Sequence, residues 1–218
     1  MDKPLGFYES TLGKKILMAV TGIILFLYLV AHMLGNLQIF MGEAQINKYA
    51  HLLHYSAAFL WTARLVILFC VGVHIYAAFQ VWWRSLKARP IGYKVYNPPS
   101  VDYAAKTMVW SGPIIAAFIT YHLAHFTVGC VHPQFVDLEP YHNVITGFQH
   151  TPVAIAYIVA LLLLGFHLYH GLWSLFQTLG LDHPKFGPWR RPLAVILTVV
   201  ITGGFISVPL SVIAGILH

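Results

Sequence analysis

The chain has 218 residues, of which 58% are hydrophobic and only 9% are charged, and its mean hydropathy is +0.70. Soluble domains carry roughly 25% charged residues, so this composition excludes an ordinary water-soluble protein and favours an integral membrane protein in contact with lipid. The formal charge of +6 does not indicate nucleic-acid binding, because the basic residues lie in three short segments beside hydrophobic spans.

Five hydrophobic stretches are long enough to cross a hydrocarbon core about 30 Å thick, which needs about 20 apolar residues per helix. They cover residues 16–41, 56–83, 107–130, 151–179 and 192–217. The connections between them are short and leave no room for a separate soluble domain. The sequence therefore predicts an all-α, integral-membrane bundle of five transmembrane helices, with one domain over residues 1–218.

The helix that contains the first hydrophobic span is predicted to begin near Ser10 or Thr11, either of which could cap it. Its apolar stretch is longer than the usual signal-peptide core of roughly 7–15 residues, and no A-x-A-like cleavage site follows it. We therefore expect a retained helix. Residues 41–55 and 131–150 are expected to form connections on one side of the membrane.

Lysine and arginine are distributed unevenly between the two sides. Eleven of the 13 basic residues fall on the side that holds the N-terminus. They are Lys3, Lys14, Lys15, Arg84, Lys87, Arg89, Lys94, Lys106, Lys185, Arg190 and Arg191. Because cytoplasmic loops carry the excess of Lys and Arg, we expect a cytoplasmic N-terminus and an outside C-terminus in the inner (cytoplasmic) cell membrane.

Four histidines lie deep inside four different spans: His32, His74, His122 and His167. An imidazole in hydrocarbon is unfavourable unless it has a partner, so such residues indicate a functional site. No carboxylate lies in these spans to pair with them. Imidazole is a good axial ligand of haem iron, so four of them predict two bis-histidine haems.

The depth of each histidine predicts how the four are paired. His32 and His122 are 16 and 15 residues into spans that run outward, which places both roughly 22–24 Å from the inner surface at about 1.5 Å per residue. His74 and His167 are 18 and 16 residues into spans that run inward, which places both in the inner half. The predicted pairs are His32 with His122 (outer) and His74 with His167 (inner).

Two neighbouring histidines leave the choice of ligands open. His125 and His170 lie three residues from His122 and His167, so each shares a helix face with its neighbour. Either could be the ligand instead, or could hydrogen-bond a haem propionate, a quinone or a facing helix. For any single buried histidine, a hydrogen bond between helices is the main alternative to ligation.

Two basic residues are candidate partners of haem propionates. Lys106 lies at the inner mouth of the third span and Arg64 lies about eight residues inside the outer end of the second. Each could pair with a propionate, and the alternative for each is a side chain that reaches the headgroups. Cys70 and Cys130 form no C-x-x-C-H motif, so covalent haem attachment is not expected.

Glycines in the spans could leave room for a porphyrin, although glycine is common in membrane helices for packing reasons. The candidates are Gly35, Gly72, Gly112, Gly165 and Gly171. In the fifth span, Gly203, Gly204 and Pro209 predict a bent, closely packed helix that closes the bundle.

Four of the five spans contain distinctive motifs. They are Gly13-Lys-Lys-Ile-Leu-Met-Ala-Val-Thr-Gly22 with His32-Met-Leu-Gly-Asn36, Val73-His74-Ile-Tyr76, Thr107-Met-Val-Trp-Ser-Gly112 with Thr120-Tyr-His122-Leu, and Gly165-Phe-His167-Leu-Tyr-His-Gly171-Leu-Trp-Ser-Leu-Phe176. These motifs resemble those of the single-chain cytochrome b membrane-anchor subunit of succinate dehydrogenases and fumarate reductases. Each motif is weak alone, but together, in this order and at these spacings, they are fairly specific.

The resemblance implies a five-helix anchor that binds two haem b groups through His32, His74, His122 and His167, in the pairs that depth predicts. It also implies a flavoprotein that oxidises succinate and an iron–sulfur subunit on the cytoplasmic face, which would pass electrons to a membrane quinone such as menaquinone (respiratory complex II). The chain would then be part of an enzyme, although it lacks the dicarboxylate site itself. Some relatives carry an acidic residue linked to proton movement where this chain has Gly165.

Two other functions fit parts of the pattern. One is the cytochrome b anchor of another respiratory oxidoreductase, such as nitrate reductase or hydrogenase, in which the ligands lie on other helices. The other is a transporter whose histidines relay protons or carry metal ions. Such a transporter would usually show broken helices or carboxylates at mid-membrane.

Overall fold

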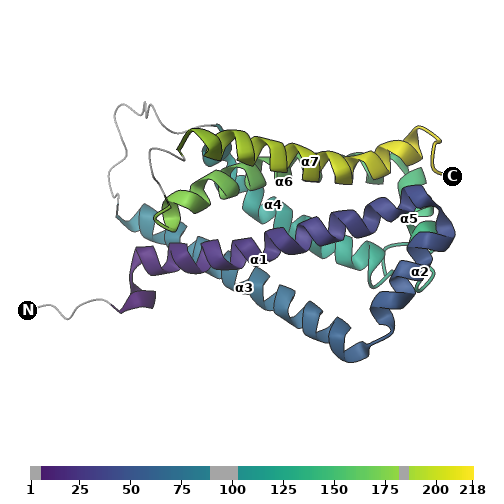
Figure 1. Ribbon diagram of the computed structural model, residues 1–218, viewed down its shortest axis with the longest axis horizontal. Coiled ribbons are helices and arrows are strands. Elements are labelled where there is room, and N and C mark those ends of the chain that lie inside the picture. Colours follow the sequence, from purple (N-terminus) through teal and green to yellow (C-terminus); the bar gives the residue numbers. More distant parts are fainter. Residues whose placement is uncertain (1–5, 89–102, 182–186) are drawn as a thin grey trace, which may run out of the picture.

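The computed structural model describes residues 6–88, 103–181 and 187–218, and helices account for nearly all of them (Figure 1). Among these residues, five helices are long and apolar enough to cross a membrane. They are α1 (Thr11–Leu37), α3 (Ala57–Lys87), α4 (Tyr103–Phe126), α6 (Thr151–Thr178) and α7 (Gly187–Ile213). The predicted all-α, five-helix membrane bundle is confirmed.

The helices extend beyond the predicted spans at one end of the bundle. α1 begins at Thr11, before the apolar span at residue 16, and this confirms the predicted start near Ser10 or Thr11. The Ser10 hydroxyl caps α1 by accepting a 2.8 Å hydrogen bond from the Gly13 N–H. α3 continues to Lys87 and α4 begins at Tyr103. Hydropathy marks only the part of a helix that is apolar, whereas the helical hydrogen bonds continue through charged turns beyond it.

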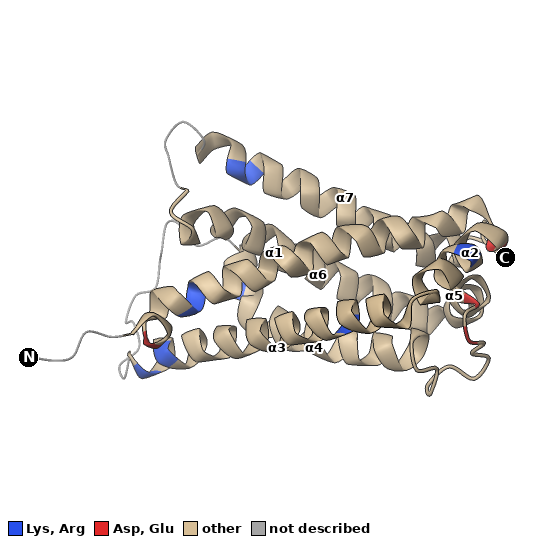
Figure 2. Ribbon diagram, turned by 60° about the horizontal axis from the view of Figure 1, so that its bottom comes forward, with Lys and Arg blue, Asp and Glu red and all other residues tan. Residues whose placement is uncertain are grey.

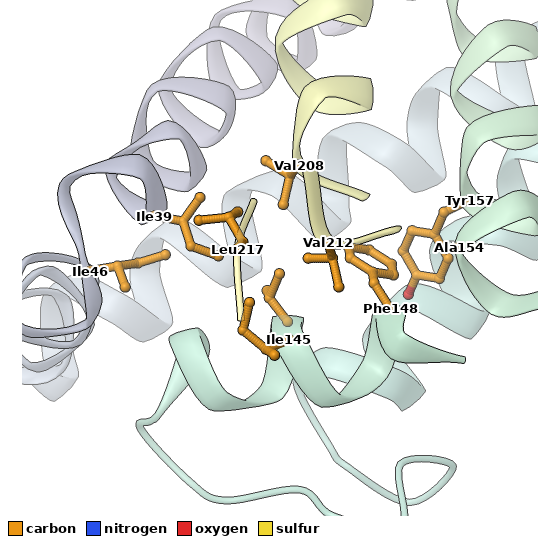
Figure 3. Close-up of a cluster of buried hydrophobic side chains, with 10 residues drawn as sticks. Ile39, Ile46, Ile145, Phe148, Ala154, Tyr157, Val208, Val212 and Leu217 are labelled. Carbon is orange, nitrogen blue, oxygen red and sulfur yellow. The ribbon is translucent and has the colours of Figure 1, made fainter. Parts of the chain in front are cut away.

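Two short helices, α2 (Glu43–His54) and α5 (Pro140–Gln149), cover the opposite end, together with a short 3₁₀ turn at Gln38–Met41. Residues 131–150 form the predicted connection, but its second half is the helix α5, which the sequence analysis did not predict. Pro140 occupies the first turn of α5, where its missing N–H costs nothing. The apolar side of α5 is buried in a cluster that also takes residues from the 3₁₀ turn, α2, the start of α6 and the end of α7 (Figure 3).

The long helices pack in a definite order. α1 lies along α3, α6 lies along both α4 and α7, and α1 also contacts α7 and α6. In contrast, α1 does not pack along α4, nor α3 along α6, within the described residues. The helix pair α1/α3 and the helix pair α4/α6 therefore face each other with more space between them than packed neighbours have.

Charge divides the two ends of the bundle. Basic residues gather where α1, α4 and α7 begin and α3 ends (Figure 2). Of the acidic residues in the described part of the chain, Glu43 begins α2, Asp137 and Glu139 lie just before α5, and Glu9 lies at the basic side. We call the two ends the basic end and the α5 end. Four predicted basic-side residues, Lys3, Arg89, Lys94 and Lys185, lie outside the described residues. Between the two ends the outward side chains are apolar, as a lipid-facing surface requires.

α7 packs closely against the rest of the bundle. A Cβ atom built on Gly204 would lie 2.5 Å from the Met33 sulfur on α1, so a larger residue here would require the buried Met33 side chain or the helix to move. Pro209, inside α7, is fully buried. The predicted close packing of the fifth span is therefore found at Gly204 and Pro209, whereas a Cβ atom on Gly203 would have no heavy atom within 4 Å.

Candidate functional site

The structure brings together the same pairs of histidines that were predicted from their depth in the membrane spans. The ring centres of His32 on α1 and His122 on α4 are 5.8 Å apart, with an interplanar angle of 84°. Those of His74 on α3 and His167 on α6 are 6.2 Å apart, at 59°. Each pair bridges two helices that do not pack along each other. The four imidazoles therefore lie in the space between α1/α3 and α4/α6.

The spacing in each pair fits two imidazoles on opposite sides of one metal ion. A metal–imidazole bond is about 2 Å long, so two nitrogens in line hold the ring centres about 6 Å apart. Within the described residues, no hydrogen bond joins the two rings of either pair. The simplest alternative, a hydrogen bond between the two histidines of a pair, is therefore not what brings these rings together.

The two pairs lie at two levels of the bundle. His74 contacts α1 at Gly22, where an added Cβ would lie 3.4 Å from its ring. His32 is ten residues farther along α1, which is about 15 Å. On the other side, the His122 ring lies 6.0 Å from that of Tyr157, and His167 is again ten residues farther along α6. Two separate helices thus yield the same spacing between the pairs.

The His32–His122 pair lies in an aromatic environment nearer the α5 end. Tyr28 stacks on the His32 ring at 5.5 Å, and Phe205 of α7 approaches it at 5.7 Å. Phe118 and Phe126 flank the His122 ring, with centres 6.0 and 5.8 Å away. These rings surround the pair with apolar surface, which suits a large flat apolar ligand and limits the access of water.

Hydrogen bonds distinguish His74 from the other three histidines. Its Nδ1 lies 3.0 Å from the Met18 carbonyl oxygen and 3.3 Å from the Thr21 hydroxyl, both on α1. The Nδ1 atoms of His122 and His167 are buried and have no hydrogen-bond partner among the described residues. A buried polar atom without a partner is unusual and indicates a functional role or a missing ligand.

His125 faces a different part of the protein from His122. Its Nδ1 lies 3.0 Å from the Tyr157 hydroxyl, and its ring centre is 4.8 Å from that of His132. His125 is only 3% exposed and has no contact with His32. This placement favours His122 as the partner of His32. His170 lies beside Trp173, at 5.9 Å between ring centres, whereas His167 faces His74.

The two predicted propionate partners lie near the expected levels. Arg64 stacks over the Trp61 ring at 5.3 Å and lines a pocket of about 190 Å³. Phe126, which packs on His122, lines the same pocket, so Arg64 is on the side of the His32–His122 pair.

Lys106 is exposed in the first turn of α4. One turn before it, Tyr103 contacts Phe166, the neighbour of His167, at 5.9 Å between ring centres. Lys106 is therefore near the level of the His74–His167 pair. That Lys106 and Arg64 bind propionates stays a prediction.

Three of the five candidate glycines have open space beside them. A Cβ on Gly72, Gly112 or Gly171 would have no heavy atom within 4 Å. The other two serve helix packing instead: a Cβ on Gly35 would lie 2.8 Å from the Tyr49 ring, and one on Gly165 would lie 3.1 Å from the Thr202 hydroxyl. Small residues at such contacts let neighbouring elements approach closely.

The sequence places a group of histidines in the outer connections, His51, His54, His132, His142 and His150, and favours ordinary interfacial residues over a metal or proton-handling role. The structure adds His125 of α4 to two of them, which was not predicted. His125, His132 and His150 line a pocket of about 270 Å³ between the ends of α4, α5 and α6. His132 is buried, and its Nε2 donates to the Asn143 carbonyl. Sequence spacing carries no signal for this cluster, because the turn at Gly129 brings His132 back onto α4. Among the described residues, no group of three or more His, Cys, Asp or Glu side chains is arranged to hold a metal ion.

Comparison with protein-family models, curated proteins and solved structures found no match to this chain. The functional conclusion therefore depends on the histidine geometry and on the sequence motifs.

Proposed function

We propose that this chain is the di-haem membrane-anchor subunit of a succinate:quinone oxidoreductase, passing electrons between an iron–sulfur subunit and a membrane quinone such as menaquinone. The observation that carries the proposal is the placement of four intramembrane imidazoles as two facing pairs, each at the spacing of trans ligands, about 15 Å apart along the bundle. The choice of succinate among possible electron donors is supported by the sequence motifs around those histidines.

In this proposal each part of the chain has a definite role. His32 and His122 hold one haem b and His74 and His167 the other, and the iron of a bound haem carries one electron at a time. The aromatic side chains around His32 and His122 exclude water and fix the two rings. α1 carries His32 and contacts His74, and α6 carries His167 and contacts His122 through Tyr157. These two helices therefore set the distance that electrons cross between the two haems.

The proposal also places the partners. The basic end faces the cytoplasm, following the distribution of Lys and Arg. The flavoprotein and iron–sulfur subunits therefore dock at that end, nearest the His74–His167 pair. Electrons then move from the basic end towards the α5 end, or in reverse when fumarate is reduced.

Continuous helices argue against the transporter alternative. None of the five membrane helices contains an Asp or Glu, and none is interrupted within its described length. Intramembrane proton or ion pathways usually depend on carboxylates or on unwound segments that line a cavity. The other alternative, an anchor of a different respiratory enzyme, differs in which helices carry the ligands. Here they are α1, α3, α4 and α6.

The first experiment is a haem measurement on the purified chain after expression with sufficient haem. We expect a reduced-minus-oxidised spectrum of b-type haem and two haems per chain. A colourless, correctly inserted protein would overturn the redox assignment.

The second experiment tests the electron donor. In membranes that contain the assembled complex, succinate is expected to reduce the haems, and malonate, a competitive dicarboxylate, is expected to block that reduction. If the chain binds two haems that dithionite reduces but succinate does not, the di-haem assignment stands and the succinate assignment is wrong.

A further inference from the structure

The ring of His74 is held by α1 in a way that no other member of the two pairs shares. Its Nδ1 approaches both the Met18 carbonyl oxygen, at 3.0 Å, and the Thr21 hydroxyl oxygen, at 3.3 Å. Gly22, on the next turn after Met18, makes the approach possible, because its missing side chain leaves the His74 ring edge in contact with the α1 backbone.

These contacts determine which ring nitrogen carries the proton. A carbonyl oxygen only accepts, so at 3.0 Å the Nδ1 of His74 must be the N–H donor. The Thr21 hydroxyl donates to its own helix at the Leu17 carbonyl, 2.8 Å away, and so turns a lone pair towards Nδ1. In the neutral ring the remaining nitrogen, Nε2, then has its lone pair free for a metal ion.

We infer that Thr21 is a positioning residue for the inner haem, the one held by His74 and His167. Together with the Met18 carbonyl, the Thr21 hydroxyl oxygen accepts the hydrogen bond from the His74 Nδ1–H. This keeps His74 in the tautomer with a free Nε2. This inference rests on the proposed function and deepens it.

The physical effect follows from the direction of the hydrogen bond. A ligand imidazole whose second N–H is donated to an oxygen becomes a stronger electron donor to its metal. A stronger donor stabilises ferric over ferrous iron and lowers the reduction potential. His122 and His167 have no such partner on Nδ1 among the described residues, so this influence belongs to one ligand of one haem.

The test is the substitution Thr21→Val, with Thr21→Ser and Thr107→Val as controls. Valine matches threonine in shape but replaces the hydroxyl by a methyl group, which cannot accept the His74 N–H and pushes against its ring. Serine keeps the hydroxyl. Thr107 also bonds a carbonyl of its own helix, Ala104, at 2.9 Å, and it contacts none of the paired histidines.

The measurement is a redox titration of the two haems in the intact complex, followed by optical and electron-paramagnetic-resonance spectra. In Thr21→Val, we expect the ferrous-to-ferric ratio of the inner haem to rise about threefold or more at a fixed potential, as loss of one modest hydrogen bond implies. The outer haem is expected to keep its potential. Thr21→Ser and Thr107→Val are expected to match the unaltered protein.

The outcomes separate this inference from the proposed function. If the unaltered protein binds two haems and Thr21→Val leaves the inner potential unchanged or lowers it, the role of Thr21 is wrong and the di-haem assignment remains. If Thr21→Val loses only the inner haem and Thr21→Ser keeps it, the inference is supported, because the hydroxyl then decides whether the ligand is held. Loss of the inner haem in both variants overturns the inference. Absence of haem from the unaltered protein refutes the proposed function itself.

Discussion

The sharpest prediction compares two histidines one turn apart on α4. His122 faces His32 at 5.8 Å between ring centres, whereas His125 bonds the Tyr157 hydroxyl at 3.0 Å and packs on His132. We expect His122→Ala to remove the outer haem and His125→Ala to keep both haems.

The structure sets the size of each effect. In the proposed function each histidine pair holds one haem, so loss of one pair is expected to lower the haem content of the chain by half and to leave the inner haem spectrum unchanged. His125→Ala removes a buried hydrogen bond and leaves the Tyr157 hydroxyl unpaired, which costs about 1–3 kcal/mol of stability without removing an iron ligand. The two substitutions therefore affect different quantities.

The assay is quantitative haem extraction per milligram of purified protein, together with the thermal inactivation temperature of each variant. His122→Gly in the presence of free imidazole is the matched control, since added imidazole can enter the vacated position and restore the second haem. If His122→Ala retained two haems and His125→Ala lost one, α4 would be rotated relative to the structure described here and the assignment of the ligand would be refuted.

Three further predictions follow from other parts of the bundle. His74→Ala or His167→Ala is expected to remove the inner haem and leave the outer one, which difference spectra can show; loss of both haems from either variant would contradict the independence of the two levels. Gly204→Leu is expected to force α7 away from Met33 and lower the yield and heat resistance of the folded protein, as detergent-solubilised melting curves would report; an unchanged melting curve would show that the close approach is unimportant. Cys130 is exposed at the α5 end whereas the other cysteine is buried, so a membrane-impermeant maleimide applied to intact cells should label Cys130 alone, and labelling only after the cells are opened would mean that the basic end faces outward.

Much of the architecture is determined locally by the sequence. Each membrane span can be recognised as a run of about 20 apolar residues. Such a run is expected to be helical, because a helix satisfies all its backbone hydrogen bonds within one segment in lipid. The depth of a histidine within a span follows from counting residues at a fixed rise per residue. The pairs His32–His122 and His74–His167 were therefore predictable before any contact between helices was known.

Only the tertiary structure shows which way each side chain faces, because counting residues along a span does not give the rotation of the helix. His122 and His125 share one helix face, and only the rotation of α4 against its neighbours turns one towards His32 and the other towards Tyr157. The helix α5 and the buried position of His132 likewise depend on packing at the far end of the bundle. The depth of a residue in the membrane depends on its own helix alone, so it can be counted from the sequence. The direction in which its side chain points depends on the helices packed around it.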